Sequence, residues 1–318
     1  MNMFLNFIIA AVLAGTPLLF GTVGEIMNEK VGHLNLGVEG MMAMGACAGF
    51  MAGFISHNLI VALLSSFVAG LIGALIYAVL TITFMADQNV TGLTITIFGV
   101  GISNFFGEYM LVNSNSNSLK LPEIITEQLS NINIPIISDI SVIGPLFFQY
   151  NPFVYIGITV AILCGIYLYR TKLGINVRAI GENPAAADAA GIKVTKLKYL
   201  NVLLGGGICG IGGAYCSIII NGGVWMNNSV NGMGWISVAL VIFSKWSPTK
   251  AILGSFIFGA FNILKYYIPK AYFTIPNAFY DMLPFVITAL ALVITSIGES
   301  KENSQPASCG VNYFREER

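Results

Sequence analysis

The chain has 318 residues, of which 56% are hydrophobic and only 9% are charged, and its mean hydropathy is +0.78. A soluble globular protein carries about 25% charged residues, so this chain has too few charges to cover a surface that faces water. Its 15 basic and 15 acidic residues balance, and no nucleic acid is expected as a partner.

Long apolar runs with few charges predict a multi-pass protein of the cell membrane. A helix needs about 20 apolar residues to cross the hydrocarbon core, and these runs are too continuous for the alternating pattern of a barrel strand. We therefore predict an all-α bundle of about 8–10 transmembrane helices. The runs are Met3–Met27 (a retained span rather than a cleaved signal, since no basic residue precedes Lys30), Leu59–Met85, Pro152–Tyr169, Leu200–Ile220, Ala251–Ile268 and Met282–Ile297.

A polar, glycine-rich stretch, VGHLNLGVEGMMAMGA (residues 31–46), follows the first run. Its glycines predict a broken helix, and freed backbone groups are tolerated at membrane depth only inside protein or beside a watery cavity. Within this stretch, Asn35 and Glu39 add polar side chains. The alternative is that Glu39 extends to the inner interface while Asn35 caps a helix beginning at Leu36, and the two interpretations are compatible.

Charge is distributed unequally between the loops. Residues 170–198 hold six basic and two acidic residues, whereas residues 113–151 hold one basic and three acidic residues. Because short basic loops stay on the cytoplasmic side, residues 170–198 are predicted to lie inside and 113–151 outside. We assign residues 1–299 to one transmembrane domain and predict that residues 300–318, which are polar and lack apolar periodicity, form a disordered cytoplasmic tail.

The predicted inside loop contains GINVRAIGENPAAADAAGI (residues 174–192). Asn183 is a good N-cap, Pro184 suits the first helical position, and Gly191 can adopt the left-handed conformation that ends a helix. Alanines favour a helix of about two turns between them. Such a helix is marginal alone in water and would be ordered by packing into a groove. The alternative is a structured connector without a partner.

The glycine run GGGICG (residues 205–210) matches the dinucleotide pattern G-x-G-x-x-G, which requires a strand before it and a helix after it. Here it lies inside an apolar run. Gly206, Gly210, Gly213 and Ser217 fall on one helix face, where small residues let helix backbones approach closely. We therefore predict a packing face rather than a nucleotide site.

The sequence contains no pattern for covalent chemistry: G-x-x-x-x-G-K-[ST], G-x-S-x-G and H-E-x-x-H are all absent. The five cysteines include no Cys-x-x-Cys pair and indicate neither a disulfide framework nor a metal site. We predict no enzyme activity, no catalytic or metal-binding residues and no cofactor of its own. Any ATP-driven work must use a nucleotide site on another polypeptide.

Two of these segments resemble ABC import permeases of the ribose, nucleoside and branched-chain amino acid group. Residues 174–192 are similar to that family's cytoplasmic coupling loop, which docks into the ATP-binding subunit. LNLGVEGMM (residues 34–42) is similar to its polar Gly-rich break, most of all to the nucleoside branch, and the Asp-Leu-Ser-Val-Gly variant of ribose-type permeases is absent. The resemblance implies that the residues coupling to the ATP-binding subunit are Gly181, Glu182, Asn183, Pro184, Ala185, Ala186, Asp188, Ala189 and Gly191.

The same resemblance implies that the break lies near a central translocation pathway. In-membrane amides elsewhere are further candidates to line it, although an ordinary interhelical hydrogen bond is the alternative for each. The pathway candidates are Asn35, Gly37, Glu39, Asn104, Asn221 and Asn262.

These observations predict the permease subunit of an ATP-driven ABC importer of nucleosides, with ribose or another simple sugar as the alternative substrate. The resemblance implies three protein partners: an ATP-binding cassette subunit, a second homologous permease and an extracytoplasmic substrate-binding lipoprotein. A candidate of another class is an ion-coupled secondary transporter. The absence of acidic residues deep in residues 59–85 and 200–220 argues against the proton relay that many such transporters use.

Overall fold

The computed structural model describes residues 3–114, 118–132, 143–267, 276–296 and 304–315, and every element of regular structure longer than a single bridge in these ranges is a helix. The elements are α1 (Met3–Lys30), α2 (Val38–Ser56), α3 (Leu59–Ala78), η1 (Val79–Thr83), α4 (Gln88–Asn113), α5 (Glu123–Gln128), α6 (Ile143–Phe147), α7 (Pro152–Arg170), α8 (Lys172–Glu182), α9 (Pro184–Ala189), α10 (Val194–Tyr215), η2 (Cys216–Ile220), α11 (Met233–Phe243), α12 (Pro248–Tyr267) and α13 (Asn277–Ser296).

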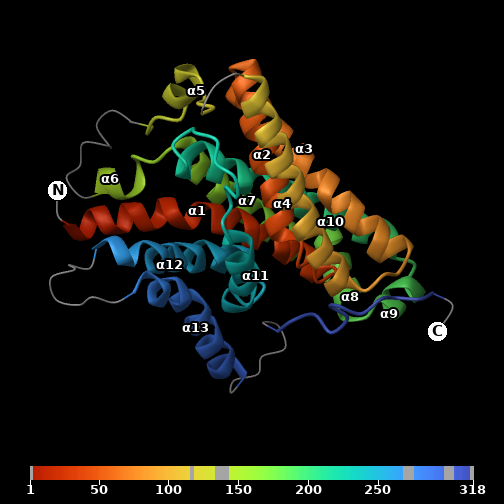
Figure 1. Ribbon diagram of the computed structural model, residues 1–318. Coiled ribbons are helices and arrows are strands. Elements are labelled where there is room, and N and C mark those ends of the chain that lie inside the picture. Colours follow the sequence, from red (N-terminus) through yellow and green to blue (C-terminus); the bar gives the residue numbers. More distant parts are fainter. Residues whose placement is uncertain (1–2, 115–117, 133–142, 268–275, 297–303, 316–318) are drawn as a thin grey trace.

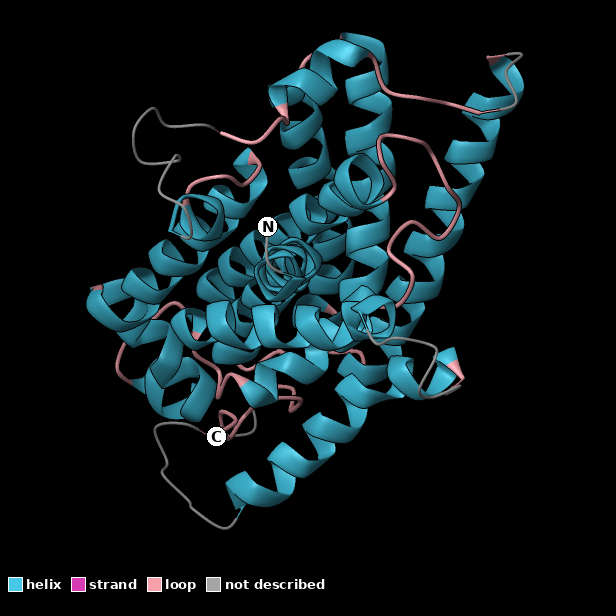
Figure 2. Cartoon of the chain, turned by 90° about the vertical axis from the view of Figure 1, so that its left-hand side faces the viewer, coloured by secondary structure: helices cyan, strands magenta, loops and turns pink. Residues whose placement is uncertain are grey.

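Six of the helical segments in the described ranges are long and apolar enough to cross a membrane: α1, α2, α3 with η1, α4, α7, and α10 with η2. The all-α membrane architecture predicted from the sequence is therefore confirmed. Helix α11 is much shorter, at 11 residues. In Figure 1, α2, α3, α4 and α10 form one group of helices, while α12 and α13 lie on the other side of α1. Figure 2 shows the same helices from a direction at right angles.

Helix α10 lies at the centre, packed against α1, α2 and α3. Its glycine face makes these contacts: a Cβ added at Gly206 or Gly210 would overlap α3, and one added at Gly213 would overlap the backbone oxygen of Met42 in α2. The Ser217 hydroxyl donates to the Ala46 oxygen at 2.9 Å. The glycine run is thus a helix-packing face, as its spacing predicts.

The described loops gather at two opposite ends of the helices. At one end, residues of the predicted outside loop pair with the segment after η2, since the Leu121 N–H donates to the Gly223 oxygen and the Trp225 N–H donates to the Leu119 oxygen. At the other end lie α8, α9 and the C-terminal residues (Figure 1). The described parts of residues 113–151 and of residues 170–198 therefore lie at opposite ends of the helices, and the side of the membrane that each faces stays a prediction.

The C-terminal residues correct one expectation. Residues 304–315, part of the tail predicted to be disordered, form an irregular segment with turns at residues 307–310, and this segment lies against the same end of the helices as α8 and α9. The Ser308 N–H donates to the Gly181 oxygen at 2.9 Å, and Pro306 is buried. The prediction failed because local polarity and absent periodicity say nothing about hydrogen bonds to distant loops. Residues 300–303 and 316–318 lie outside the described residues.

We expect a single methyl group to disrupt the central packing. In the Gly213→Ala variant the new Cβ would overlap the Met42 backbone, which cannot move without displacing α2, and such overpacking costs about 1–3 kcal/mol. Gly101→Ala is the matched control, because a Cβ at this exposed helical position meets no atom within 4 Å. Thermal unfolding of the detergent-solubilised protein should show a lower midpoint for Gly213→Ala alone. Equal midpoints would contradict the close approach of α10 and α2.

Candidate functional site

The break between α1 and α2 spans residues 31–37 and includes Gly32, whose φ is +89°. Polar side chains from three helices satisfy its backbone. The donors and acceptors are Leu34 N–H to Gln88 Oε1 (2.8 Å), Asn35 N–H to Glu25 Oε1 (2.8 Å), Tyr77 O–H to the Leu34 oxygen (2.8 Å) and Thr96 O–H to the Leu36 oxygen (2.8 Å). The irregular backbone is therefore buried in protein, as the lipid environment requires.

His33 is the one ring in this break, and it is 1% exposed, edge-on to Tyr77 at 6.2 Å between ring centroids. Burial lowers the pKa of His33 well below 6.5, and the positive charge of Lys198 lowers it further. Burial thus favours the uncharged imidazole; both ring nitrogens are buried without a hydrogen-bond partner in the structure.

Asn35 makes local contacts that suit a capping residue. Its side-chain oxygen accepts from the Gly37 N–H at 2.9 Å, and the residue is fully buried. Helix α2 starts at Val38, two residues later than the capping interpretation expects. Gly37 itself packs against Ile95 of α4. These two pathway candidates therefore build the turn into α2 instead of lining a pocket.

Glu39 points inward to the start of α11 instead of extending to the inner interface. Its two carboxylate oxygens accept from the Gly232 N–H at 2.8 Å and the Gly234 N–H at 2.7 Å, and the residue is 7% exposed. The first N–H groups of a helix have no partner within it and carry partial positive charge. The Glu39 carboxylate accepts hydrogen bonds from these N–H groups and its negative charge offsets their partial positive charge. Glu39, a residue of α2, therefore caps α11.

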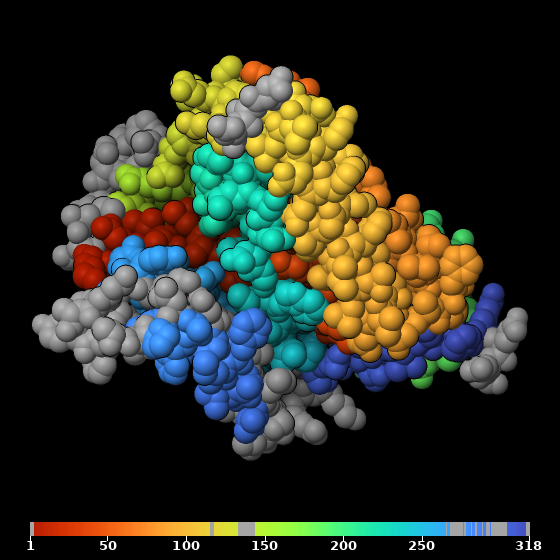
Figure 3. Space-filling model, in the orientation of Figure 1, coloured from red at the N-terminus to blue at the C-terminus, as the bar shows by residue number. Residues whose placement is uncertain are grey.

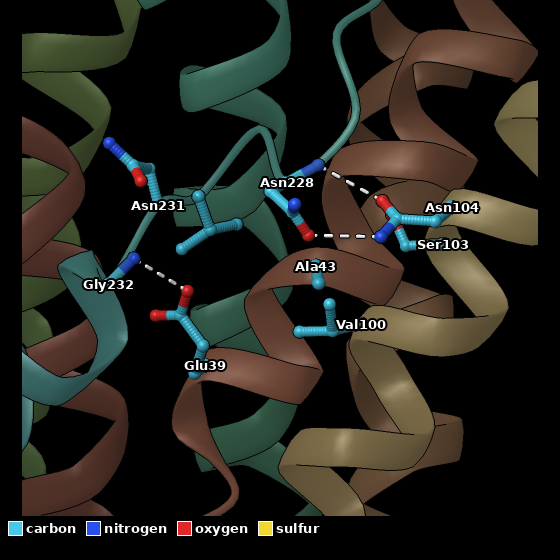
Figure 4. A pocket seen from close by; sticks show the side chains of 9 residues that line it. Glu39, Ala43, Val100, Ser103, Asn104, Asn228, Asn231 and Gly232 are labelled. Carbon is cyan, nitrogen blue, oxygen red and sulfur yellow. Dashed lines mark hydrogen bonds between the residues drawn. The ribbon is translucent and has the colours of Figure 1, made fainter.

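Glu39 also forms the deep end of a pocket of about 320 Å³ (Figure 4). Two asparagines cross its upper part: Asn104 Nδ2 donates to Asn228 Oδ1 at 2.9 Å, and the Asn228 N–H donates to Asn104 Oδ1 at 3.0 Å. Ser103 is buried, whereas Asn228 and Asn231 are exposed at the rim. The lining residues are Glu39, Ala43, Val100, Ser103, Asn104, Asn228, Val230, Asn231 and Gly232.

The pocket lies at membrane depth between α4 and the segment before α11. Its lining residues on α4, Val100, Ser103 and Asn104, lie 12 to 16 residues after Gln88, which is roughly 18–24 Å along that helix at 1.5 Å per residue. On the face shown in Figure 3, α4 (yellow) lies beside the segment that leads into α11 (teal). The pocket thus brings polar groups to a depth where lipid would otherwise exclude them.

The structure brings Glu39 and Asn104 together but leaves two other pathway candidates elsewhere. Asn221 ends η2 near the outer loops, and Asn262 lies on α12, which packs mainly against α1. Sequence reasoning missed Asn228 and Asn231. The polar run MNNSVNG (residues 226–232) between two apolar stretches could have predicted them. It is the same pattern that indicated the first break.

The predicted coupling segment folds as expected into a capped helix, α9. Asn183 Oδ1 accepts from the Ala186 N–H at 3.0 Å, Pro184 is the first helical residue, and Gly191 adopts φ +82°. An additional helix, α8, precedes it and is capped by Thr171. Helix α8 was not predicted from the sequence.

The two faces of α9 differ in exposure. Ala187 is 4% exposed and faces this chain, whereas Ala186 and Ala189 are exposed. Glu182 and Asn183, at the junction of α8 and α9, are also exposed. Because these outward side chains are small, a second protein could approach the helix backbone closely. Across the described ranges, the structure brings no three His, Cys, Asp or Glu side chains together as a metal site.

Comparison with known families gives one match that covers most of the chain. Residues 7–292 match the family described as the permease component of the branched-chain amino acid transport system.

Similar proteins extend this result. The chain is 34% identical over 322 residues to the nucleoside ABC transporter permease protein NupC of Lactococcus lactis, covering 98% of both chains. It is 31% identical to the guanosine ABC transporter permease protein NupQ of Bacillus subtilis, covering 99% of this chain and 98% of the relative. It is 33% identical to a provisionally named glucose ABC transporter permease of Haloferax volcanii, covering 80% of this chain and 75% of the relative.

A solved structure shares the fold. It is an inward-facing ABC transporter assigned provisionally to the metal-chelate type, with a TM-score of 0.51, 17% sequence identity, and coverage of 92% of this chain and 86% of the other.

We expect Glu39 to stabilise the junction of α2 and α11. Glu39→Ala leaves the Gly232 and Gly234 N–H groups without their acceptor, and a hydrogen bond to a charged group contributes about 1.5–3 kcal/mol. Glu39→Gln, which keeps one acceptor oxygen, should lie between Glu39→Ala and the parent in thermal unfolding. Glu123→Ala, at an exposed carboxylate of α5, is the control. A Glu39→Ala midpoint equal to that of the control would contradict the capping role.

Proposed function

Because the chain belongs to the family of branched-chain amino acid transport system permease components, we propose that it forms the membrane pathway of an ATP-driven importer of nucleosides. It is a multi-pass protein of the plasma membrane and not an enzyme. Membership of this family favours an ABC permease over the ion-coupled secondary transporter considered from the sequence.

The observation that carries the proposal is the pocket between α4 and α11. Asn104 and Asn228 place amide donors and acceptors in it, with Asn231 at the rim. A nucleoside carries ribose hydroxyls and a heterocycle with both donors and acceptors, so a pocket lined by amides can form hydrogen bonds with either part. Ala43 and Val100 supply apolar surface against which a base can pack.

Similarity to named relatives supports nucleosides over sugars. The two nucleoside and guanosine permeases align over almost the whole chain. The glucose relative has a similar identity over a shorter part, and it keeps a simple sugar as the second candidate.

Permeases of this family work with an ATP-binding subunit and a substrate-binding protein. We propose further that a second homologous permease completes the pathway, that a lipoprotein outside the membrane delivers the substrate, and that the ATP-binding subunit binds the ATP. Helix α9 is proposed to dock into the ATP-binding subunit through the face that carries Ala186 and Ala189. Its other coupling residues are those predicted from the sequence.

Uptake by the complete transporter tests the substrate. Labelled uridine uptake should be competed by adenosine and guanosine far better than by ribose or glucose, because the sugars lack the heterocycle. It should stop on ATP depletion and persist when ionophores collapse ion gradients. Equal or better competition by a free sugar would replace nucleosides by sugars as the substrate.

Tryptophan substitutions test α9. Ala186→Trp adds bulk on the exposed face, so the permease should fold normally while the ATP-binding subunit co-purifies less, since overpacking a contact costs about 1–3 kcal/mol. Ala187→Trp, on the buried face of the same helix, should instead lower the stability of the permease itself. If Ala186→Trp and Ala189→Trp both assemble and transport like the parent, α9 is only a connector.

A further inference from the structure

The C-terminal segment, residues 304–315, joins three separate parts of the inner end of the protein. The first contact is with the end of α8. The Ser308 N–H and hydroxyl both donate to the Gly181 oxygen, at 2.9 and 2.6 Å. A Cβ added at Gly181 would lie 3.2 Å from Pro306, so the segment lies close against the α8 backbone just before α9.

The second contact is with the turn between η1 and α4. Asn312 Nδ2 donates to the Met85 and Ala86 oxygens at 2.6 and 3.1 Å, and Asn312 Oδ1 accepts from Gln88 Nε2 at 3.2 Å. Gln88, the first residue of α4, uses its own side-chain oxygen to hold the Leu34 N–H in the break. Asn312 therefore contacts the start of α4 directly, and Gln88 connects it to the break that precedes α2.

The third contact is with α9 itself. Asp188 Oδ2 accepts from the Tyr313 hydroxyl at 2.9 Å and pairs with Arg315 Nε at 3.1 Å. Asp188 is only 13% exposed at its side chain, whereas Arg315 is 76% exposed. Neighbouring residues of the C-terminal segment therefore bind both α9 and the start of α4.

The path from α9 to the pocket is then continuous. From Asp188 it passes through Tyr313 and Asn312 to Gln88, and from there along α4 to Ser103 and Asn104 in the pocket wall. A six-residue helix is marginal without such support. A rigid helix and hydrogen bonds of fixed geometry are the means by which two distant sites can bias one another.

We propose that the C-terminal segment transmits movement between α9 and α4, with Tyr313 and Asn312 as positioning residues that link ATP hydrolysis to opening of the pocket. This inference rests on the proposed function. Without the segment, α9 remains able to dock, but its displacement is no longer passed to α4.

The test uses the complete transporter in liposomes with its ATP-binding and substrate-binding proteins. The variant Tyr313→Phe with Arg315→Gln removes both contacts to Asp188 with little change in side-chain shape, and Asn312→Ala removes the contacts to α4. Val311→Ala, at an exposed position in the same segment, is the matched control. The measured quantity is uridine transported per ATP hydrolysed, together with subunit stoichiometry.

Both variants should assemble and hydrolyse ATP. The amount of uridine transported per ATP hydrolysed should fall about 5-fold or more, because typical coupling between two sites changes affinity by at least about that factor. The control should match the parent. In addition, Tyr313→Phe combined with Asp188→Ala should be no worse than Asp188→Ala alone, because Asp188→Ala already removes the acceptor of the Tyr313 hydroxyl. Parent-like transport per ATP, or additive losses in that double variant, would overturn the proposal. Loss of assembly would also overturn it, by making the segment part of the docking surface.

Hydrogen exchange separates this result from the substrate question. In the purified permease, amides of residues 185–191 should exchange faster in the Tyr313→Phe and Arg315→Gln variant than in Val311→Ala. A parent complex that transports no nucleoside would refute the proposed function while leaving this difference in place. Equal exchange in both variants would refute the role of the C-terminal segment alone.

Discussion

Backbone N–H groups at membrane depth must find a partner within the protein, and the Glu39 carboxylate provides it for the start of α11. Residues 31–37 and 221–232 both lack continuous helix. Glu39 stands in the first turn of α2, directly after the first of these breaks, and its carboxylate accepts from Gly232 at the end of the second break and from Gly234 in α11. The polar pocket lies beside this carboxylate, where Asn104 and Asn228 form hydrogen bonds with each other and line the wall.

The structure depends also on close packing of α10 at its centre. Helix α10 could not lie against α2 and α3 at this distance if Gly206, Gly210 and Gly213 carried side chains. Lipid offers no hydrophobic driving force between helices, so close contact between backbones is one of the main sources of association. The same packing holds α2 in place and, through α2, sets the position of Glu39.

Features that depend on local chemistry were predicted from the sequence. The capped helix α9 follows from Asn183, Pro184 and Gly191, and the packing face of α10 follows from its glycine spacing. Features that depend on distant partners were not. Glu39 was expected either to line a pathway or to extend to the interface, and its cap on α11 joins residues 193 positions apart. The order of residues 304–315 likewise depends on Gly181, Met85 and Asp188, which no local pattern in the tail reveals.

The exposed rim of the pocket has a consequence for how substrate choice can evolve. Glu39 and Ser103 close its deep end, but Asn228 and Asn231 stand at an open edge. In the proposed complex a second permease covers that edge, and the enclosed chamber would then be built from two chains. Replacing one subunit then changes half of the chamber wall without altering the other half. On this proposal, a change of pairing partner would alter selectivity without any substitution in this chain.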